Sequence, residues 1–341
     1  MVFAIKYNDM SMRMKVNLSD YKKIIKFPKY DLGNWPTPIY KIDNEYPIYV
    51  KRDDLSGYGR QGIKIRKLET FLAYHLKKGY RNLIFIVPNI SNLQNDLELI
   101  AQKENLKIVF IIANNPPLSK ELRNNFIETS NVKHLLAGKS NLSVISKAIG
   151  TFIRLYFVEG EKYKIILPGA SHPSSIIGST NGIFECYEQF KSNNVTMPKK
   201  IFISASSGGS AAGLILGALI LQREKAIKLK IHVTKVYPIS LKYWIYFLLI
   251  WTKFKYKLEV NIKLSDVNIH QAYKDIAYGA NKTFLKDKVE EIDSFYNLKV
   301  DHIYGAQSWI VMEKFLANQN QNLEAFLFWH CGFTINSHLF K

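Results

Sequence analysis

The residue in this chain that most clearly suggests chemistry is a lysine, Lys64, which follows a glycine at the start of an apolar-patterned helix. Residues 60–69 read R-Q-G-I-K-I-R-K-L-E, shortly after the polar run K-R-D-D-L at 51–55. A lysine amine held partly out of water loses its proton more easily and can attack an aldehyde. Enzymes hold pyridoxal phosphate (PLP) in this way, so Lys64 is a candidate catalytic residue. The alternative is a solvated lysine at a helix start.

A second candidate is a serine- and glycine-rich turn between an apolar strand and an alanine-rich helix. Such a turn can aim several backbone N–H groups and the positive end of the helix at one anion. It lacks the Gly-Lys-Ser/Thr ending of a P-loop, and no G-x-G-x-x-G fingerprint is present, so we expect a phosphate monoester rather than a nucleotide. The alternative is a capped loop without a ligand. The turn consists of Ser206, Ser207, Gly208, Gly209 and Ser210.

Composition places the chain among globular proteins. It has 341 residues, 47% hydrophobic and 22% charged, which is enough for two lobes with separate cores. The net charge of +19 would suit nucleic acid or another anionic partner, but acidic residues are mixed throughout and no long basic block appears. We therefore expect a thinly spread charge and no nucleic-acid partner.

Cysteines and apolar runs indicate the compartment. Two cysteines, Cys186 and Cys331, give neither a disulfide framework nor a metal site, and the histidines show no metal-ligand spacing. We expect a cytoplasmic protein without a metal. The most apolar run, 243–251, is about half the ~20 residues that a spanning helix needs. It predicts a buried or subunit-facing helix, with no membrane partner.

Apolar runs alternate with amphipathic stretches along most of the chain, which predicts an α/β protein. Two lobes are expected, each an open, mostly parallel sheet flanked by helices. The predicted domains are a large one, 1–65 with 176–341, and a small one, 66–175. Strands are predicted at 83–87, 107–112, 132–136, 164–167, 201–203, 229–236 and 325–329, and helices near 91–104, 141–157, 175–190 and 211–222.

Together these segments resemble the family of 1-aminocyclopropane-1-carboxylate (ACC) deaminase and D-cysteine desulfhydrase, PLP enzymes of fold type II with the tryptophan-synthase-β fold. Residues 62–69 resemble the family motif G-N-K-x-R-K-L-E, and Ser91-Asn92 resembles part of Q-S-N-H, at the family spacing from Lys64. The remaining matches are 207–210 with the phosphate loop, 277–279 with G-Y-G, 302–304 with P-V-Y and 330–332 with the closing H-T-G-G.

The resemblance implies a role for each matched position. Lys64 would form the Schiff base with PLP, and Ser91 would contact the substrate carboxylate. Asn92 would bond the phenolic oxygen of the cofactor, while Tyr278 and Tyr304 would serve as base or nucleophile. The turn at 206–210 would hold the phosphate, and the assembly would be a homodimer. Lys67, one helical turn after Lys64, would either approach the phosphate or lie exposed on the helix. Each residue also has an ordinary reading: a helix cap for Ser91, a surface amide for Asn92 and packing for the tyrosines.

Three departures from the family pattern bear on the activity. Ile63 replaces the asparagine before the lysine, Leu93 replaces the histidine of Q-S-N-H, and Gly305 replaces the Glu or Thr associated with the pyridine nitrogen. The expected activity is that of a PLP-dependent lyase or deaminase in amino acid metabolism, acting on a small amino acid. D-Cysteine is the leading substrate because β-elimination requires only the lysine and an electron sink. The departures also admit a divergent non-catalytic member serving as a binding or scaffold subunit.

Overall fold

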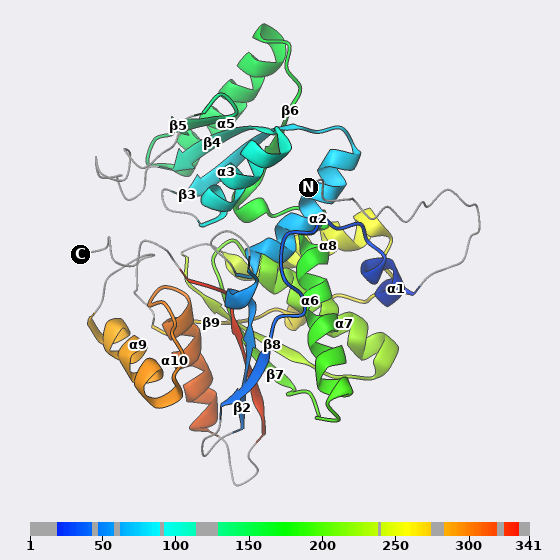
Figure 1. The fold of residues 1–341 in the computed structure, drawn as a ribbon, viewed down its shortest axis with the longest axis vertical. Coiled ribbons are helices and arrows are strands. Elements are labelled where there is room, and N and C mark those ends of the chain that lie inside the picture. Colours follow the sequence, from blue (N-terminus) through cyan, green and yellow to red (C-terminus); the bar gives the residue numbers. More distant parts are fainter. Residues whose placement is uncertain are drawn as a thin grey trace. The chain divides into compact units, whose positions relative to one another are not determined.

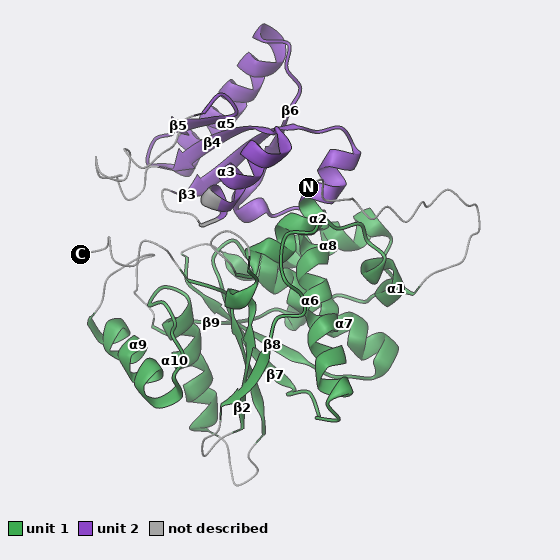
Figure 2. Ribbon diagram, in the orientation of Figure 1, with its two compact units in different colours: residues 1–71, 173–341 green, residues 72–172 purple. Residues whose placement is uncertain are grey.

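The computed structural model of the chain describes residues 19–42, 47–57, 62–88, 92–113, 129–237, 240–273, 283–318 and 324–333, without the side chains of Asn92 and Asn95. The chain divides into two compact units (Figure 2). Unit 1 comprises residues 1–71 and 173–341, and unit 2 comprises 72–172. The first division therefore falls inside a helix, α2 (Lys64–Lys77), a few residues after the position expected from the sequence.

Unit 1 is built on a six-stranded sheet with the order β1-β2-β10-β7-β8-β9. Only the pair β1–β2 is antiparallel, and the other neighbouring pairs are parallel. The strands are β1 (Ile39–Ile42), β2 (Ile48–Arg52), β7 (Lys200–Ala205), β8 (Lys230–Lys235), β9 (Asn268–His270) and β10 (Phe326–His330).

Helices cover both faces of this sheet (Figure 1). Side chains alternate between the faces along each strand: Ile201 and Ile203 of β7 pack in one core with α6, α7 and α8, whereas Phe202 packs in the other with α9 and α10. The helices are α1 (Asp20–Ile25), α6 (Pro173–Ser192), α7 (Gly209–Lys225), α8 (Leu241–Tyr256), α9 (Thr283–Tyr296) and α10 (Gly305–Leu316).

Unit 2 contains a four-stranded, wholly parallel sheet with the order β5-β4-β3-β6. A separate core joins Ile84, Val109 and Ile111 to Val144 and Ala148 of a crossover helix. The elements are β3 (Asn82–Pro88), α3 (Asn92–Glu104), β4 (Lys107–Ala113), β5 (Val132–Leu136), α5 (Asn141–Ile153) with a π-helical turn (Arg154–Val158), and β6 (Tyr163–Ile166).

The predicted fold class is confirmed, because both units are parallel or mostly parallel sheets flanked by helices. Each predicted strand and helix is found within a few residues of its expected position. The apolar run 243–251 lies in α8, whose inner face is buried while Tyr243 and Phe247 are exposed. In the part of the chain that the structure describes, every helix is too short or too polar to cross a membrane.

Candidate functional site

The carboxyl ends of the parallel strands of unit 1 share one edge of the sheet, where open α/β sheets bind their ligands. Strand β10 lies between β2 and β7. Cys331 follows β10 at this edge, next to the end of β7, with which β10 pairs. The backbone carbonyl of Cys331 also accepts a hydrogen bond from the Ile63 N–H at 3.1 Å. The residue before Lys64 is thus attached to the same strand end that adjoins the serine–glycine turn.

Gly62 and Ile63 fix the start of the Lys64 helix. Gly62 has φ +107°, and a Cβ there would lie 2.4 Å from the Cys331 carbonyl oxygen, so glycine is required. Its N–H donates to the Ser56 hydroxyl at 2.9 Å. Ile63 is 4% exposed and packs in the core shared with α6 and α7. The replacement of asparagine by isoleucine therefore anchors the helix through apolar packing, and Lys64 itself is partly exposed.

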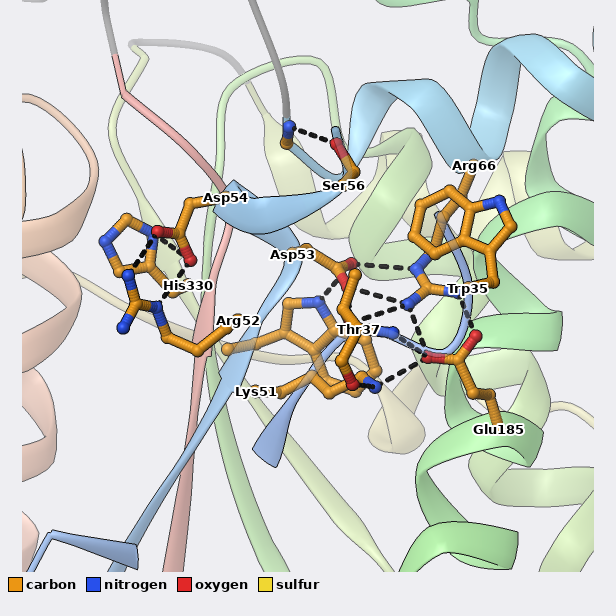
Figure 3. A network of polar contacts seen from close by, with 12 residues as sticks. Trp35, Thr37, Lys51, Arg52, Asp53, Asp54, Ser56, Arg66, Glu185 and His330 are labelled. Atoms are coloured by element: carbon orange, nitrogen blue, oxygen red, sulfur yellow. Dashed lines mark hydrogen bonds and ion pairs between the residues drawn. The ribbon is translucent and has the colours of Figure 1, made fainter. Parts of the chain in front are cut away.

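A buried polar network around Arg66 holds the first turn of α2 in place (Figure 3). The Arg66 guanidinium bonds both oxygens of Asp53, at 2.7 and 2.9 Å, and both oxygens of Glu185 at 2.8 Å. Lys51 reaches Glu185 at 2.6 Å, and the Trp329 indole donates to Asp53 at 2.8 Å. Burial raises the pKa of Asp53, but the charge and hydrogen bonds of Arg66 outweigh it and hold that pKa below its usual value. The network joins α2 to β2, α6 and β10.

The last residue of the motif also acts as an anchor. The Glu69 carboxylate accepts the N–H groups of Leu32 and Gly33 at 3.0 Å and the Trp35 indole at 2.7 Å. Burial raises the pKa of Glu69, and these donors partly offset the rise. Arg66 and Glu69 therefore position the helix that carries Lys64.

Lys67 is buried, so the reading of this residue as an exposed helix lysine is wrong. It is 2% exposed, and burial, followed by the charge of Lys64, lowers the pKa of its ammonium to about 7. A buried cation beside a second cation favours an anionic neighbour. Lys67 thus lies one helical turn from Lys64 and suits a phosphate as that neighbour.

The serine–glycine turn connects β7 to α7, as the sequence predicts. Gly208 caps α7 with φ +75° and without a side-chain bond, so the first N–H groups of the helix remain available as donors. A Cβ on Gly208 would lie 2.8 Å from Ile245, and the Trp244 indole donates to the Ser207 carbonyl at 2.9 Å. The turn therefore packs against α8 through Ile245 and Trp244. Its donors fit a phosphate group.

Tyr304 precedes α10, near the end of β10. Its N–H and that of Gly305 both donate to the Asp301 carboxylate at 2.8 Å, which caps α10. His330, the last residue of β10, bonds the Lys299 carbonyl at 2.7 Å. Lys299 therefore lies beside the carboxyl end of β10, and Ser308 of α10 accepts a hydrogen bond from Thr234 near the carboxyl end of β8 at 3.5 Å, so the start of α10 lies on the same edge as Cys331. Among the predicted site residues, Lys64, the turn 206–210 and Tyr304 thus all lie along the carboxyl edge of one sheet.

Gly305 cannot gain a side chain without a further change. A Cβ at this position would lie 2.6 Å from the Cβ of Val300, which is itself 5% exposed. Val300 therefore leaves no room at this position for the Glu or Thr that the family motif has. The side chain of Gln307 is held within α10, because its amide donates a hydrogen bond to the Ile303 carbonyl at 2.9 Å.

We expect Gly305→Thr to lower the free energy of unfolding by about 1–3 kcal/mol, because it overpacks the Val300 site. Val300→Gly, which removes the Cβ that a side chain at Gly305 would meet, should itself cost about 2–4 kcal/mol through the cavity and the freer backbone that it leaves. The double variant should lose less than the sum, since each change relieves the other. Urea unfolding of the four proteins measures the coupling. Gly150→Thr is the matched control, because a Cβ on that helical glycine meets no atom within 4 Å; additivity at Gly305 would contradict the prediction.

Two predicted residues, Ser91 and Tyr278, lie outside the described residues, and the side chain of Asn92 is likewise not described. Their roles stay predictions. Leu93 is 1% exposed within unit 2, so the position matched to a family histidine is an apolar core residue here. Sequence reasoning missed the anchoring roles of Asp53 and Glu185. Asp53 lies in the quoted run K-R-D-D-L, so it could have been considered, whereas Glu185 lies in no motif that would have drawn attention to it.

No family model matches the sequence, but individual relatives do. A putative ACC deaminase of Pyrococcus abyssi is 28% identical over 327 residues, which cover 90% of this chain and 92% of the relative. A putative ACC deaminase of Thermotoga maritima is 26% identical and covers 89% and 96%. A D-cysteine desulfhydrase of Serratia proteamaculans is 26% identical over 58% of this chain and 62% of the relative.

Solved structures agree on the fold. An ACC deaminase homologue superposes with a TM-score of 0.77 at 23% identity, covering 92% of this chain and 94% of that one. O-ureido-L-serine synthase superposes with a TM-score of 0.59 at 12% identity, covering 89% and 91%. The resemblance that the sequence motifs indicated is thereby confirmed: the chain is similar to putative ACC deaminases over 90% of its length, and it has the architecture of PLP enzymes of fold type II.

Proposed function

We propose that this protein is a PLP-dependent lyase or deaminase that acts on a small amino acid, with D-cysteine or a related β-substituted amino acid as substrate. The carrying observation is the bond from Ile63 to Cys331, which places Lys64 at the end of β10, beside the strand whose following turn offers phosphate donors. The relatives named ACC deaminase and D-cysteine desulfhydrase support the same activity.

In this proposal each residue has one task. The N–H groups and hydroxyls of the turn 206–210 bind the phosphate, and Lys67 balances its charge. The Lys64 amine holds the cofactor and moves a proton at the substrate α-carbon. The cofactor, when bound, supplies the electron sink. Ser91 binds the substrate carboxylate, Asn92 orients the cofactor ring, and Tyr278 and Tyr304 supply phenol groups for proton transfer.

The substrate assignment is tested by comparing two reactions of the protein purified with PLP. We expect D-cysteine to release sulfide, ammonia and pyruvate, and ACC to be the poorer substrate, because Gly305 offers no side chain for additional chemistry. L-Cysteine serves as the control for handedness. Preferred ammonia release from ACC would contradict the assignment. Cofactor binding without turnover of any amino acid would instead favour the non-catalytic alternative.

The proposal includes a cytoplasmic homodimer. Its support is the outer face of α8, where Tyr243, Phe247 and Phe254 are 66%, 50% and 73% exposed. Contiguous aromatic surface of this kind is typical of protein contacts. Sedimentation of the wild type and of Phe247→Glu measures whether this face joins two copies.

A further inference from the structure

Unit 2 has a pocket of about 640 Å³ between α5 and β5, the strand at one end of its sheet. Lys133 of β5 pairs with Val109 of β4, which packs under α5. Side chains that pair across neighbouring strands lie on the same face, so Lys133 and, two residues on, Leu135 are on the α5 side of the sheet. Helix α5 packs mainly over β3, β4 and β6. The pocket therefore occupies the part of this face, above β5, that the helix does not cover.

The floor of the pocket is apolar. Val109, Ala137 and Leu155 line the pocket and are buried, so they form its floor. Gly150 of α5 also lines it, and a Cβ at this position would meet no atom within 4 Å, so open space adjoins this glycine. A floor of this kind fits the apolar or aromatic body of a small molecule.

The rim of the pocket is cationic. Lys133, Lys147 and Arg154 line the pocket and are exposed, together with one carboxylate, that of Glu159. The lining therefore has two more cations than anions. A phosphate monoester carries a charge of about −1.5 to −2 at neutral pH, so one such group would balance this excess.

The acidic residues around the pocket are already paired. The Glu159 carboxylate lies 3.3 Å from Nε of Arg154, and Glu161 forms an ion pair with Lys107. Within the part of the chain that the structure describes, neither rim lysine forms an ion pair. The guanidinium of Arg154 has further N–H donors besides Nε. The rim can thus offer cationic donors to a ligand.

We propose that this pocket binds a small phosphate monoester with an apolar or aromatic body, whose phosphate lies at the rim and whose body lies on the floor. The hydroxyl groups of Ser146 and Thr151, which line the pocket from α5, supply further donors. Charge-assisted bonds of this kind are stronger than neutral ones. The proposal does not depend on the proposed activity.

The ligand of this pocket is distinct from the substrate of the proposed reaction. His134 lies between Lys133 and Leu135 in β5, so its side chain is on the opposite face of the sheet. There its Nε2 lies 2.9 Å from the Glu98 carboxylate of α3. Helix α3, which begins at Asn92, therefore covers the face that the pocket does not use.

Calorimetric titration of the full chain, purified with PLP, measures the binding of two monoesters, adenosine monophosphate and phenyl phosphate. Lys147→Glu and Arg154→Glu should each weaken both affinities about tenfold or more, because each reverses a charge at the rim. Glu159→Gln should tighten them about threefold, because it removes a carboxylate that competes for Arg154. Lys162→Glu, exposed in unit 2 but outside the pocket, is the charge-matched control and should change them by less than about twofold.

A leucine at position 150 tests whether the ligand lies in the pocket. Gly150→Leu extends into the open space without a change of charge and should abolish binding of both monoesters. Leucine also favours a helix more than glycine does, so thermal unfolding should show no loss of stability. Adenosine and inorganic phosphate, each lacking one of the two parts, should bind at least about tenfold more weakly than adenosine monophosphate.

Three results would overturn the proposal. The first is that neither monoester binds up to millimolar concentration. The second is that Gly150→Leu binds both monoesters as tightly as the wild type does. The third is that Lys162→Glu weakens binding as much as Lys147→Glu, which would assign the affinity to the overall positive charge of the chain and not to this pocket.

Discussion

Replacing Lys64 with alanine is expected to lower kcat/KM by about 10³-fold or more, because one amine both holds the cofactor and moves the proton. The variant should also lose the visible absorbance of a lysine-bound cofactor. Lys77→Ala is the matched control, since Lys77 lies at the exposed end of the same helix. It should retain wild-type activity and absorbance.

Borohydride reduction followed by peptide mass analysis identifies the reacting amine. Lys67 is the chemical rival, because its pKa of about 7 leaves much of it uncharged at neutral pH. We expect the reduced cofactor on Lys64 and not on Lys67, which is buried one turn further along the helix. Attachment to Lys67, or full activity of Lys64→Ala, would refute the assignment of Lys64.

Arg66→Met is expected to destabilise the protein by about 3–5 kcal/mol, because it leaves Asp53 and Glu185 buried without their guanidinium partner. The comparison is Arg154→Met, which removes an ion pair of an arginine that is 76% exposed and should cost at most about 1 kcal/mol. Urea unfolding measures both. A loss for Arg66→Met no larger than that for Arg154→Met would show that the network does not anchor α2.

The pH dependence of the stability difference between wild type and Arg66→Met tests whether the Arg66–Asp53 ion pair causes it. The pKa of Asp53 is lowered in the folded wild type, so its stabilisation is present above the unfolded value of 3.8 and is lost as pH falls through the folded value. Without Arg66, the remaining partners of Asp53, including Lys51 and the Trp329 indole, oppose the effect of burial less strongly, so the pKa of Asp53 rises and the carboxyl becomes neutral at higher pH. The gap in stability between wild type and Arg66→Met should therefore narrow as pH falls below about 4. A gap independent of pH would assign the effect to packing.

Much of the fold could be predicted from the sequence because its signals are local. Apolar runs of strand length, separated by amphipathic stretches, indicated parallel sheets, and glycines marked the turns before α2 and α7. The position of Lys64 followed from the same logic, since Gly62 and the apolar pattern after it define a helix start. Lys67 was open to two readings because a helical pattern does not reveal which neighbours cover a charged residue.

The remaining features depend on contacts between distant segments. Arg66 and Glu185 form an ion pair although they are 119 residues apart in the sequence, and no spacing rule predicts such a pair. A side chain at position 305 would clash with Val300, which only the structure shows. The sequence shows only that the residue at this position is a glycine. The outer face of α5 has the apolar periodicity of a core helix, and only the structure reveals that Leu142, Ile145 and Ile149 on this face are exposed.

The hydrogen bond between Trp244 and Ser207 supplies this protein with a fluorophore seated on the turn proposed to receive the phosphate. Indole emission depends on the electrostatic field around the ring, so an arriving dianion would alter it directly. A titration with inorganic phosphate could thus follow the filling of the turn even in a catalytically silent variant. The remaining tryptophans can be subtracted by comparison with Trp244→Phe.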